Sequence, residues 1–568
     1  MLDVRVAFRL FQVTSSAADR LHAVSTPALW DRILPIMSRR RKMWLVRLVL
    51  VYSPVMDVFA ASPCLPCHAK EIAGYEKTAM ARSLSRSAHQ PSGSFTHAFS
   101  GTEFSVRPAG DTMQITMRRD GLSATYQADY AVGSGSHAYG YLVRISDYLF
   151  QAPISYYVKR GTWDMAPGYE SDPEPDFSRP VSAECVECHA GHPRPVKDTL
   201  NRYETPAFSV ETISCDRCHG DPAAHLRQPS RQNIVNPQRL PTCARGSICE
   251  QCHLTGETRV LNPGRQFGDF QPGRELEEVF SVYVRDASDP ALLKGPIKVI
   301  SHAEQLALSA CARKSAGKLW CGTCHNPHEQ PENTAKYYRE RCLSCHGNTI
   351  LQTHALPAGD CISCHMTRRK AKDGAHTVFT DHRIARIPQA ADDNSSTTPP
   401  VGKLVAWHEP PSSLAVRNLG LANIEIGERD HSAEHMEEGA RQVVAAMKVL
   451  PPDPAMLTKV GLVFLRKGEA SDAIDVFEYT LGLDPSRAGS YANLGNAYKE
   501  AGQTDKAISE LERAIQLDPS LEIAYRSLAE IFAKVKDQDK VRAIYKRYLQ
   551  FMPESVAMRE ALIRYGAR

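Results

Sequence analysis

The chain has 568 residues, of which 42% are hydrophobic and 23% charged, and these proportions are ordinary for a soluble protein of several domains. Its formal net charge is only +4, and its one basic run lies within positions 38–43. Composition and charge therefore give no indication of a nucleic-acid partner.

The N-terminal region has the order of a secretory signal peptide. The basic residues Arg39 to Lys42 precede an apolar run from Trp44 to Ala60, which ends in small residues. We expect translation to start at Met37, with residues 1–36 as an upstream extension and residues 37–61 as the signal peptide. The protein would then be periplasmic or secreted. The alternative is a short membrane anchor, but the run is near the lower limit for a bilayer span, so we expect at most peripheral membrane association.

The next segment, residues 62–92, contains the motif Cys64–Leu65–Pro66–Cys67–His68 and a predicted helix. Residues 93–180 differ from it, because polar and apolar residues alternate there, as from Met113 to Met117. Turn residues such as Asp120–Gly121 separate the alternating stretches. This pattern predicts a β-rich insertion of short antiparallel strands.

Six further Cys-x-x-Cys-His motifs lie in residues 181–387, where Pro, Gly and His are frequent and helical patterns are short. Two thiols separated by two residues can add to the two vinyl groups on one edge of a porphyrin, and the adjacent histidine can then bind the iron. We therefore predict seven covalently bound haem c groups. The attachment residues are Cys64, Cys67, Cys185, Cys188, Cys215, Cys218, Cys249, Cys252, Cys321, Cys324, Cys342, Cys345, Cys361 and Cys364. The proximal iron ligands are His68, His189, His219, His253, His325, His346 and His365.

Two other interpretations of the cysteine pairs are possible. Paired Cys-x-x-Cys units form structural zinc sites, and an exported chain with sixteen cysteines could be rich in disulfides. Neither needs a histidine after every pair, and all seven pairs have one. Haem attachment accounts for fourteen cysteines and leaves Cys243 and Cys311 without a role.

The C-terminal third of the chain is periodic. Residues 388–413 are polar and rich in proline, which predicts a flexible linker. Beyond it, within residues 414–568, prolines recur every 34 residues from Pro451 to Pro553. Small and large packing residues such as Gly495 and Tyr498 keep the same offsets. This is the pattern of tetratricopeptide repeats, with three good repeats and a partial one that fits only its second helix. The alternative is an unrelated helical bundle.

Second axial ligands must come from elsewhere in the chain. Ten histidines remain for seven irons once those outside the haem region are set aside. They are His89, His97, His137, His192, His225, His302, His328, His354, His376 and His382. His192 and His328 follow their own proximal histidine by three residues, so either could bind only a neighbouring haem. Met80 is a further candidate for the first haem.

Several stretches of the chain are similar to exported multihaem cytochromes of the cytochrome c554/c-prime-like, doubled Cys-x-x-Cys-His class with C-terminal tetratricopeptide repeats. The matching stretches are Cys215 to Gly220 with His225, Ser301 to Gln305, Cys321 to His328, His376 to Ile384, Gly133 to Ala138 and Trp163 to Tyr169. The resemblance covers the chain from about residue 62 onward. It implies that His137, His225, His302, His328, His376 and His382 are distal ligands, and it leaves the first haem open between Met80 and His89.

The expected fold class is mixed: a haem-packed, mostly α-helical or irregular cytochrome domain with a β-rich insertion, followed by an α-helical tetratricopeptide-repeat solenoid. The resemblance implies electron transfer between redox partner proteins, which we expect to dock through the repeats. We name no catalytic residue. The alternatives are an oxidoreductase acting on a small nitrogen or sulfur species at a five-coordinate haem, and a haem-based sensor or scaffold.

Overall fold

The computed structural model describes residues 62–86, 90–286, 288–289, 292, 296–347, 350, 360–374, 376–386 and 400–566. The expected extension, the signal peptide, His89, His354 and residues 388–399 of the expected linker lie outside these ranges. The chain divides into two compact units, Met1–Ala69 and Lys70–Arg568. The described part of the first unit holds the first motif, and the other six motifs belong to the second unit. No helix among the described residues is long and apolar enough to cross a membrane.

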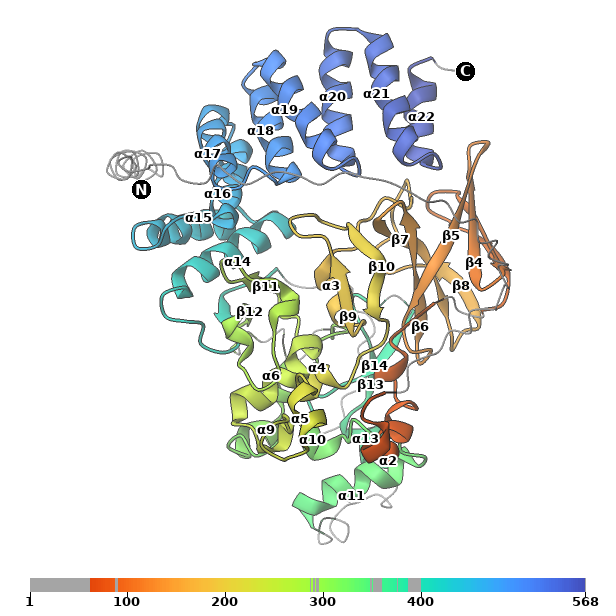
Figure 1. Ribbon diagram of the computed structural model, residues 1–568, viewed down its shortest axis with the longest axis vertical. Helices are drawn as coiled ribbons and strands as arrows, with labels where there is room; N and C mark the ends of the chain where they lie inside the picture. The colour runs from red at the N-terminus through yellow and green to blue at the C-terminus, as the bar shows by residue number, and fades with distance from the viewer. Residues whose placement is uncertain are drawn as a thin grey trace, which may run out of the picture. The chain divides into compact units, whose positions relative to one another are not determined.

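The first large element is an eight-stranded antiparallel sheet, which confirms the predicted β-rich segment (Figure 1). Its strand order is β2–β3–β4–β5–β6–β7–β8, and β1 pairs with β5. In β4, Met113, Ile115 and Met117 point into the core while their neighbours are more exposed. Asp120 and Gly121 both have positive φ, as the tight turn between β4 and β5 requires. The strands are β1 (Leu84–Arg86), β2 (Gly93–Thr96), β3 (Glu103–Ala109), β4 (Thr112–Arg119), β5 (Leu122–Val132), β6 (Ala138–Ile145), β7 (Tyr148–Tyr157) and β8 (Thr162–Met165).

The motif-bearing segment consists of short helices joined by loops. Four of these helices, α4, α6, α11 and α13, end on the histidine of a Cys-x-x-Cys-His motif. The helices are α2 (Leu65–Tyr75, which runs across the division between the units), α3 (Ala183–Glu187), α4 (Asp216–His219), α5 (Ala223–Arg227), α6 (Thr242–His253), α8 (His302–Leu308), α9 (Ala310–Lys314), α10 (Cys321–Cys324), α11 (Thr334–His346) and α13 (Cys361–His365). Single 3₁₀ turns include η2 (Met80–Arg82).

Three small antiparallel sheets lie in the same region of the chain as these helices. They are β9 (His192–Pro195) with β10 (Tyr203–Val210), β11 (Thr258–Leu261) with β12 (Phe280–Arg285) and β15 (Leu404–Ala406), and β13 (Arg368–Lys370) with β14 (Val378–Thr380). Strand β15 lies within the region that the sequence predicts to be a flexible linker. Leu404 is buried and β15 pairs with β12, so the described end of that region is part of a sheet.

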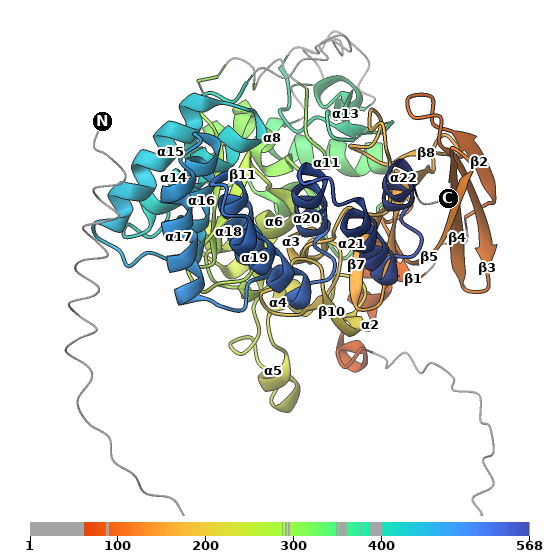
Figure 2. The ribbon, with the colours of Figure 1, turned by 90° about the horizontal axis from the view of Figure 1, so that it is seen from above.

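The C-terminal part is a row of paired helices, visible in both views (Figures 1 and 2). Gly461 faces the ring of Phe477, and Gly495 faces Leu511, so closely that an added Cβ would lie 2.5 Å and 2.7 Å from them. Small residues therefore stand where paired helices touch, as the repeat pattern predicts. The helices are α14 (Ala415–Arg429), α15 (Ala433–Met447), α16 (Pro454–Arg466), α17 (Ala470–Leu483), α18 (Ala488–Glu500), α19 (Thr504–Leu517), α20 (Glu522–Lys534), α21 (Gln538–Phe551) and α22 (Val556–Arg564).

The partial repeat is more complete than the sequence suggests. Helix α14 packs on α15 as a full first helix, and Gly439 approaches the Gly420 carbonyl so closely that an added Cβ would lie 2.6 Å from its oxygen. The sequence pattern missed α14 because its buried positions include polar residues such as Arg417 and Asn418. Those polar residues have partners outside the repeats.

The first and last repeat helices are joined to the rest of the unit. Arg417 is 2% exposed, donates to the Leu261 carbonyl at 2.9 Å and pairs with Asp453 at 2.7 Å. Asn418 Nδ2 donates to the side-chain oxygens of Asn262 and Ser281. At the other end, Arg119 of β4 pairs with Glu560 of α22 at 2.7 Å. The repeats therefore do not form the separate module that a flexible linker would give.

Replacing Arg417 by Ala should destabilise the protein by about 3 kcal/mol, because the change leaves the carboxylate of Asp453 without its cation and the Leu261 carbonyl without its donor. Denaturant-induced unfolding monitored by circular dichroism measures this. Arg441→Ala is the matched control, since Arg441 makes an exposed ion pair within α15. Equal stability of the two variants would contradict the anchoring role of Arg417.

Candidate functional site

The third and fifth motifs meet through a pair of histidine rings. His219 and His328 are nearly parallel, at 12°, with centroids 5.8 Å apart. Two imidazoles that bind opposite sides of one metal, at about 2 Å each, have centroids roughly 6 Å apart. His219 Nδ1 lies 2.8 Å from the Val235 carbonyl oxygen. Since a carbonyl can only accept, the proton is on Nδ1, and Nε2 keeps the lone pair that a metal needs.

The fourth and fifth motifs meet around a second histidine cluster. The centroids of His253 and His302 are 5.3 Å apart, and those of His302 and His382 are 4.9 Å apart. His325 and His382 are 6.2 Å apart at 30°. His382 Nδ1 lies 2.9 Å from the Thr380 carbonyl oxygen, which again leaves Nε2 as the lone-pair nitrogen. Three of the expected distal ligands, His302, His328 and His382, therefore lie against motif histidines.

Protein atoms lie close around these histidine rings, although His325 and His253 keep solvent-accessible surface. Burial lowers the pKa of His302 to about 3 and that of His325 to about 4. The imidazoles are therefore neutral at physiological pH, which is the form that binds metals. His325 nevertheless keeps an exposed surface, as does His253, whose pKa burial also lowers. In addition, His302 Nδ1 is buried and has no hydrogen-bond partner among the described residues.

The other expected distal ligands have different surroundings. His137 lies 4.5 Å from the ring of Phe379, beside β14. His225 Nδ1 is held by the Ser230 carbonyl at 3.0 Å. His376 Nε2 lies 3.0 Å from the carboxylate of Asp164, so in this arrangement its ring pairs with an acid. Met80 is half-buried in η2.

Two of the ten available histidines are engaged elsewhere. His97 is buried just after β2, and its two ring nitrogens bond to the Ser100 hydroxyl and the Glu170 carbonyl. His192 Nε2 lies 2.7 Å from the Asp216 carboxylate. These contacts occupy both ring nitrogens of His97 and the Nε2 nitrogen of His192 in this structure.

Most helices of this segment bury no side chain, although α6 buries five residues and α3 buries two. All thirteen residues of α11 are described and none is buried, whereas α18, of the same length, buries seven. The described residues of α4, α5, α9, α10 and α13 likewise include none that are buried. Isolated helices this short are unstable in water, so a segment built from them needs another body to pack against. Together with the orphaned His302 Nδ1, this fits a core filled by haem.

The motif cysteines lie close to one another across motifs. The thiol of Cys188 interacts with that of Cys252, and Cys342 interacts with Cys361. All sixteen cysteines belong to the described residues, and none of them forms a disulfide there. The described residues also contain no group of three or more His, Cys, Asp or Glu side chains placed to hold a metal ion. Haem needs no such group, because the porphyrin supplies four of the iron ligands.

The cysteines outside the motifs remain unassigned. Cys243 is exposed on α6 and Cys311 is half-buried on α9. Burial raises the pKa of Cys324, and the nearby thiol of Cys311 adds to this shift, so Cys311 lies beside the fifth motif. Nothing in their surroundings explains why cysteine stands at either position.

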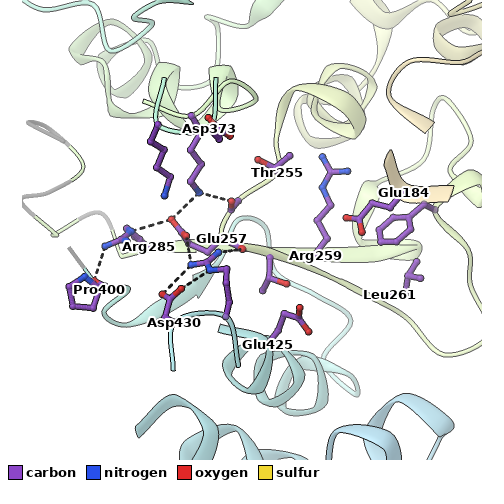
Figure 3. Close-up of a pocket in the computed structure, with 16 residues that line it drawn as sticks. Glu184, Thr255, Glu257, Arg259, Leu261, Arg285, Asp373, Pro400, Glu425 and Asp430 are labelled. Atoms are coloured by element: carbon purple, nitrogen blue, oxygen red, sulfur yellow. Dashed lines mark hydrogen bonds and ion pairs between the residues drawn. The ribbon is translucent and has the colours of Figure 1, made fainter. Parts of the chain in front are cut away.

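A charged pocket lies between the segment after the fourth motif and α14 (Figure 3). Glu257 stands at its centre and binds Lys298 at 2.9 Å, Arg285 at 3.1 Å and Arg429 of α14 at 3.1 Å. Burial opposes ionisation of Glu257, but the surrounding cations, Lys298 first, outweigh it and lower its pKa to about 2. Sequence reasoning missed this cluster, because its members are far apart in the chain and no local pattern connects them.

Removal of the thiols of the sixth motif should release α11. A Cys342→Ser/Cys345→Ser variant would lose the haem that these thiols are expected to attach. Because no buried side chain holds this helix either, the amides of residues 334–346 should then lose protection from hydrogen exchange. Mass spectrometry measures the exchange, with α18 as the internal reference. Cys243→Ser, outside every motif, should leave α11 protected. Full protection of α11 in the double variant would show that its own side chains hold it.

Comparison with known proteins identifies only the C-terminal part. The family model of the tetratricopeptide repeat matches residues 495–536. No curated protein matches the chain. Similar solved structures include the APC/C hetero-tetramer Cut9–Hcn1, at 19% identity over 27% of this chain and 32% of that chain, with a TM-score of 0.23.

Two further structures cover a similar share of the chain. MamA is 22% identical over 26% of this chain and 81% of its own, with a TM-score of 0.23. A thermophilic tetratricopeptide-repeat protein of Thermus thermophilus is 20% identical over 26% and 80%, with a TM-score of 0.22. This chain spans about a third of the first of the three structures and most of the other two. The C-terminal helices are tetratricopeptide repeats, on the family match and the 34-residue spacing.

Proposed function

We propose that this protein is an exported multihaem c-type cytochrome that transfers electrons between redox partners. Its seven Cys-x-x-Cys-His motifs would attach seven haem c groups, and its signal peptide would direct it to the periplasm or out of the cell. The observation that carries the proposal is the pairing of motif histidines with histidines from other segments. His219 lies beside His328, and His325 lies beside His382, with centroid separations close to those of two axial ligands of one iron.

Haem iron, when bound, supplies one-electron oxidation and reduction, and the residues of the chain hold and orient it. The two thiols of each motif would fix one edge of the porphyrin. The Val235 carbonyl accepts from His219 Nδ1, which leaves Nε2 as the nitrogen that would bind the iron, and the Thr380 carbonyl does the same for His382. Because His328 follows the fifth motif and faces the third, it would tie two neighbouring haems into one rigid array.

The repeats are the part of the chain suited to bind another protein. Tetratricopeptide repeats commonly mediate protein–protein contacts, and they carry no redox chemistry of their own. We propose that they dock a redox partner. Their anchors at Arg417 and Glu560 would hold that partner in a fixed position relative to the haems.

One contact favours a second candidate function. His376, an expected distal ligand, has its Nε2 on the carboxylate of Asp164. If it stays there when haem is bound, and none of the other candidates such as His89, His354 or Met80 takes its place, one iron lacks a sixth protein ligand. The protein would then be an oxidoreductase acting on a small nitrogen or sulfur species at that haem. A stoichiometric high-spin signal in the electron paramagnetic resonance spectrum of the oxidised wild type would favour this candidate over the carrier.

Protein matured in a host that attaches c-type haem should keep seven haems after denaturation, because thioether bonds survive unfolding. Intact mass spectrometry counts them. Cys321→Ser/Cys324→Ser should lose one haem, whereas Cys243→Ser should lose none. Bound zinc, or fewer haems in the wild type, would contradict the proposal.

Replacing His328 by Ala should open one iron without reducing the haem count, since the thioethers remain. We expect a new high-spin signal, and carbon monoxide binding by the reduced protein beyond that of the wild type. His431→Ala is the control, because His431 is exposed within the repeats. A spectrum unchanged from that of the wild type would mean that His328 is not an axial ligand.

A further inference from the structure

Gln305 is the only buried residue of α8, although Glu304 also ties this helix to the segment after the fourth motif by accepting from the Gly256 N–H at 3.0 Å. Of the seven residues of this helix, all described, only Gln305 is buried, and it is 5% exposed. Its Nε2 donates to the Ser301 hydroxyl at 2.6 Å, and that hydroxyl donates to the Lys298 carbonyl at 2.8 Å. These bonds hold the first turn of α8, where His302 stands.

The other end of the Gln305 amide reaches a different segment. The backbone N–H of His382 donates to Gln305 Oε1 at 2.8 Å. The turn around His382 is itself rigid, because Asp381 is buried and pairs with Arg369 at 3.0 Å and with Arg383 at 2.6 Å. One amide side chain therefore connects the start of α8 to a fixed turn eighty residues further along the chain.

The two histidines joined in this way face different motifs. His302 lies against His253 of the fourth motif, and His382 lies against His325 of the fifth. Their own rings are 4.9 Å apart at 82°. A shift of α8 relative to the turn would therefore change the orientation of both rings toward their motif histidines at once.

The hydrophobic surroundings cannot replace this connection. No apolar side chain of α8 is buried, and half-buried Ala303 packs against the hydrophobic cluster that contains Leu254 and Phe280, so apolar packing fixes the rotation and position of α8 only weakly. A buried amide with satisfied partners is directional, and loss of a partner leaves a buried donor or acceptor unpaired. Gln305 has the length to bond both Ser301 and His382, which the shorter amide of asparagine lacks.

We infer that Gln305 is a positioning residue that sets the axial-ligand geometry of two haems together, those of the fourth and fifth motifs. It acts through His302 and His382 and touches neither iron. This inference rests on the proposed function. Beyond that function, one side chain would fix the axial ligands of two haems together.

The test replaces Gln305 by Met, which keeps the volume and removes both hydrogen bonds. Protein with seven haems by mass should show changed electron paramagnetic resonance g-values for two haems. The midpoint potentials of the same two haems should shift, while the other five stay as in the wild type. Ser301→Ala removes only the bond on the α8 side and should produce the same changes at smaller amplitude. This second variant also serves if Gln305→Met fails to mature.

Gln442→Met is the matched control. Gln442 also bonds two partners through its amide, accepting from Asn423 at 2.8 Å and donating to Glu438 at 2.7 Å, but it lies within the repeats. Its replacement should leave all g-values and potentials unchanged. Spectra of haem-loaded Gln305→Met and Ser301→Ala identical to that of Gln442→Met would overturn the inference alone. A wild type without covalent haem would instead overturn the proposed function.

Discussion

Short helices without buried side chains need a partner, and this requirement governs the motif-bearing half of the molecule. Helix α11 has thirteen residues and buries none of them, while α18 in the repeats buries seven. A helix of this length gains too little from its own hydrogen bonds to remain folded in water. The proposed haems would supply the missing apolar surface, so the cofactor would be structural as well as functional. The paired histidines and the two-way hydrogen bonding of Gln305 then serve one purpose, which is to hold rigid groups in a fixed mutual arrangement.

The sequence predicted those elements whose structure depends on a local pattern of residues. Alternation around Met113 predicted the strands of the large sheet, and the 34-residue spacing of prolines predicted the repeats. The spacing rule for His328, which forbids it to reach its own haem, agrees with its position against His219. Helix α14 was missed, because its buried face includes Arg417 and Asn418, which are not typical of a repeat core.

Interactions between distant segments could not be predicted in this way. The region of residues 400–413 has the composition of a linker, yet Leu404 is buried and β15 completes a sheet. A single sequence does not show that β12 offers a free edge to this strand. Similarly, no pattern around His376 indicates that Asp164 lies beside it, or that Glu257 is surrounded by cations from three other segments. Residue type and spacing identify candidate ligands, whereas their pairing is a property of the tertiary structure.

The anchoring of the repeats at both ends has a mechanical consequence. In a tetratricopeptide solenoid each repeat contacts only the repeats next to it in the chain. Such a solenoid can therefore change its curvature at a low cost in free energy. Here α14 is held by Leu261, Asn262 and Ser281, and α22 by Arg119. Stretching or twisting the array would break buried polar contacts at one end or the other. A protein that binds these repeats therefore meets a surface whose curvature is already set, so little conformational entropy is lost on binding and mismatched shapes are rejected.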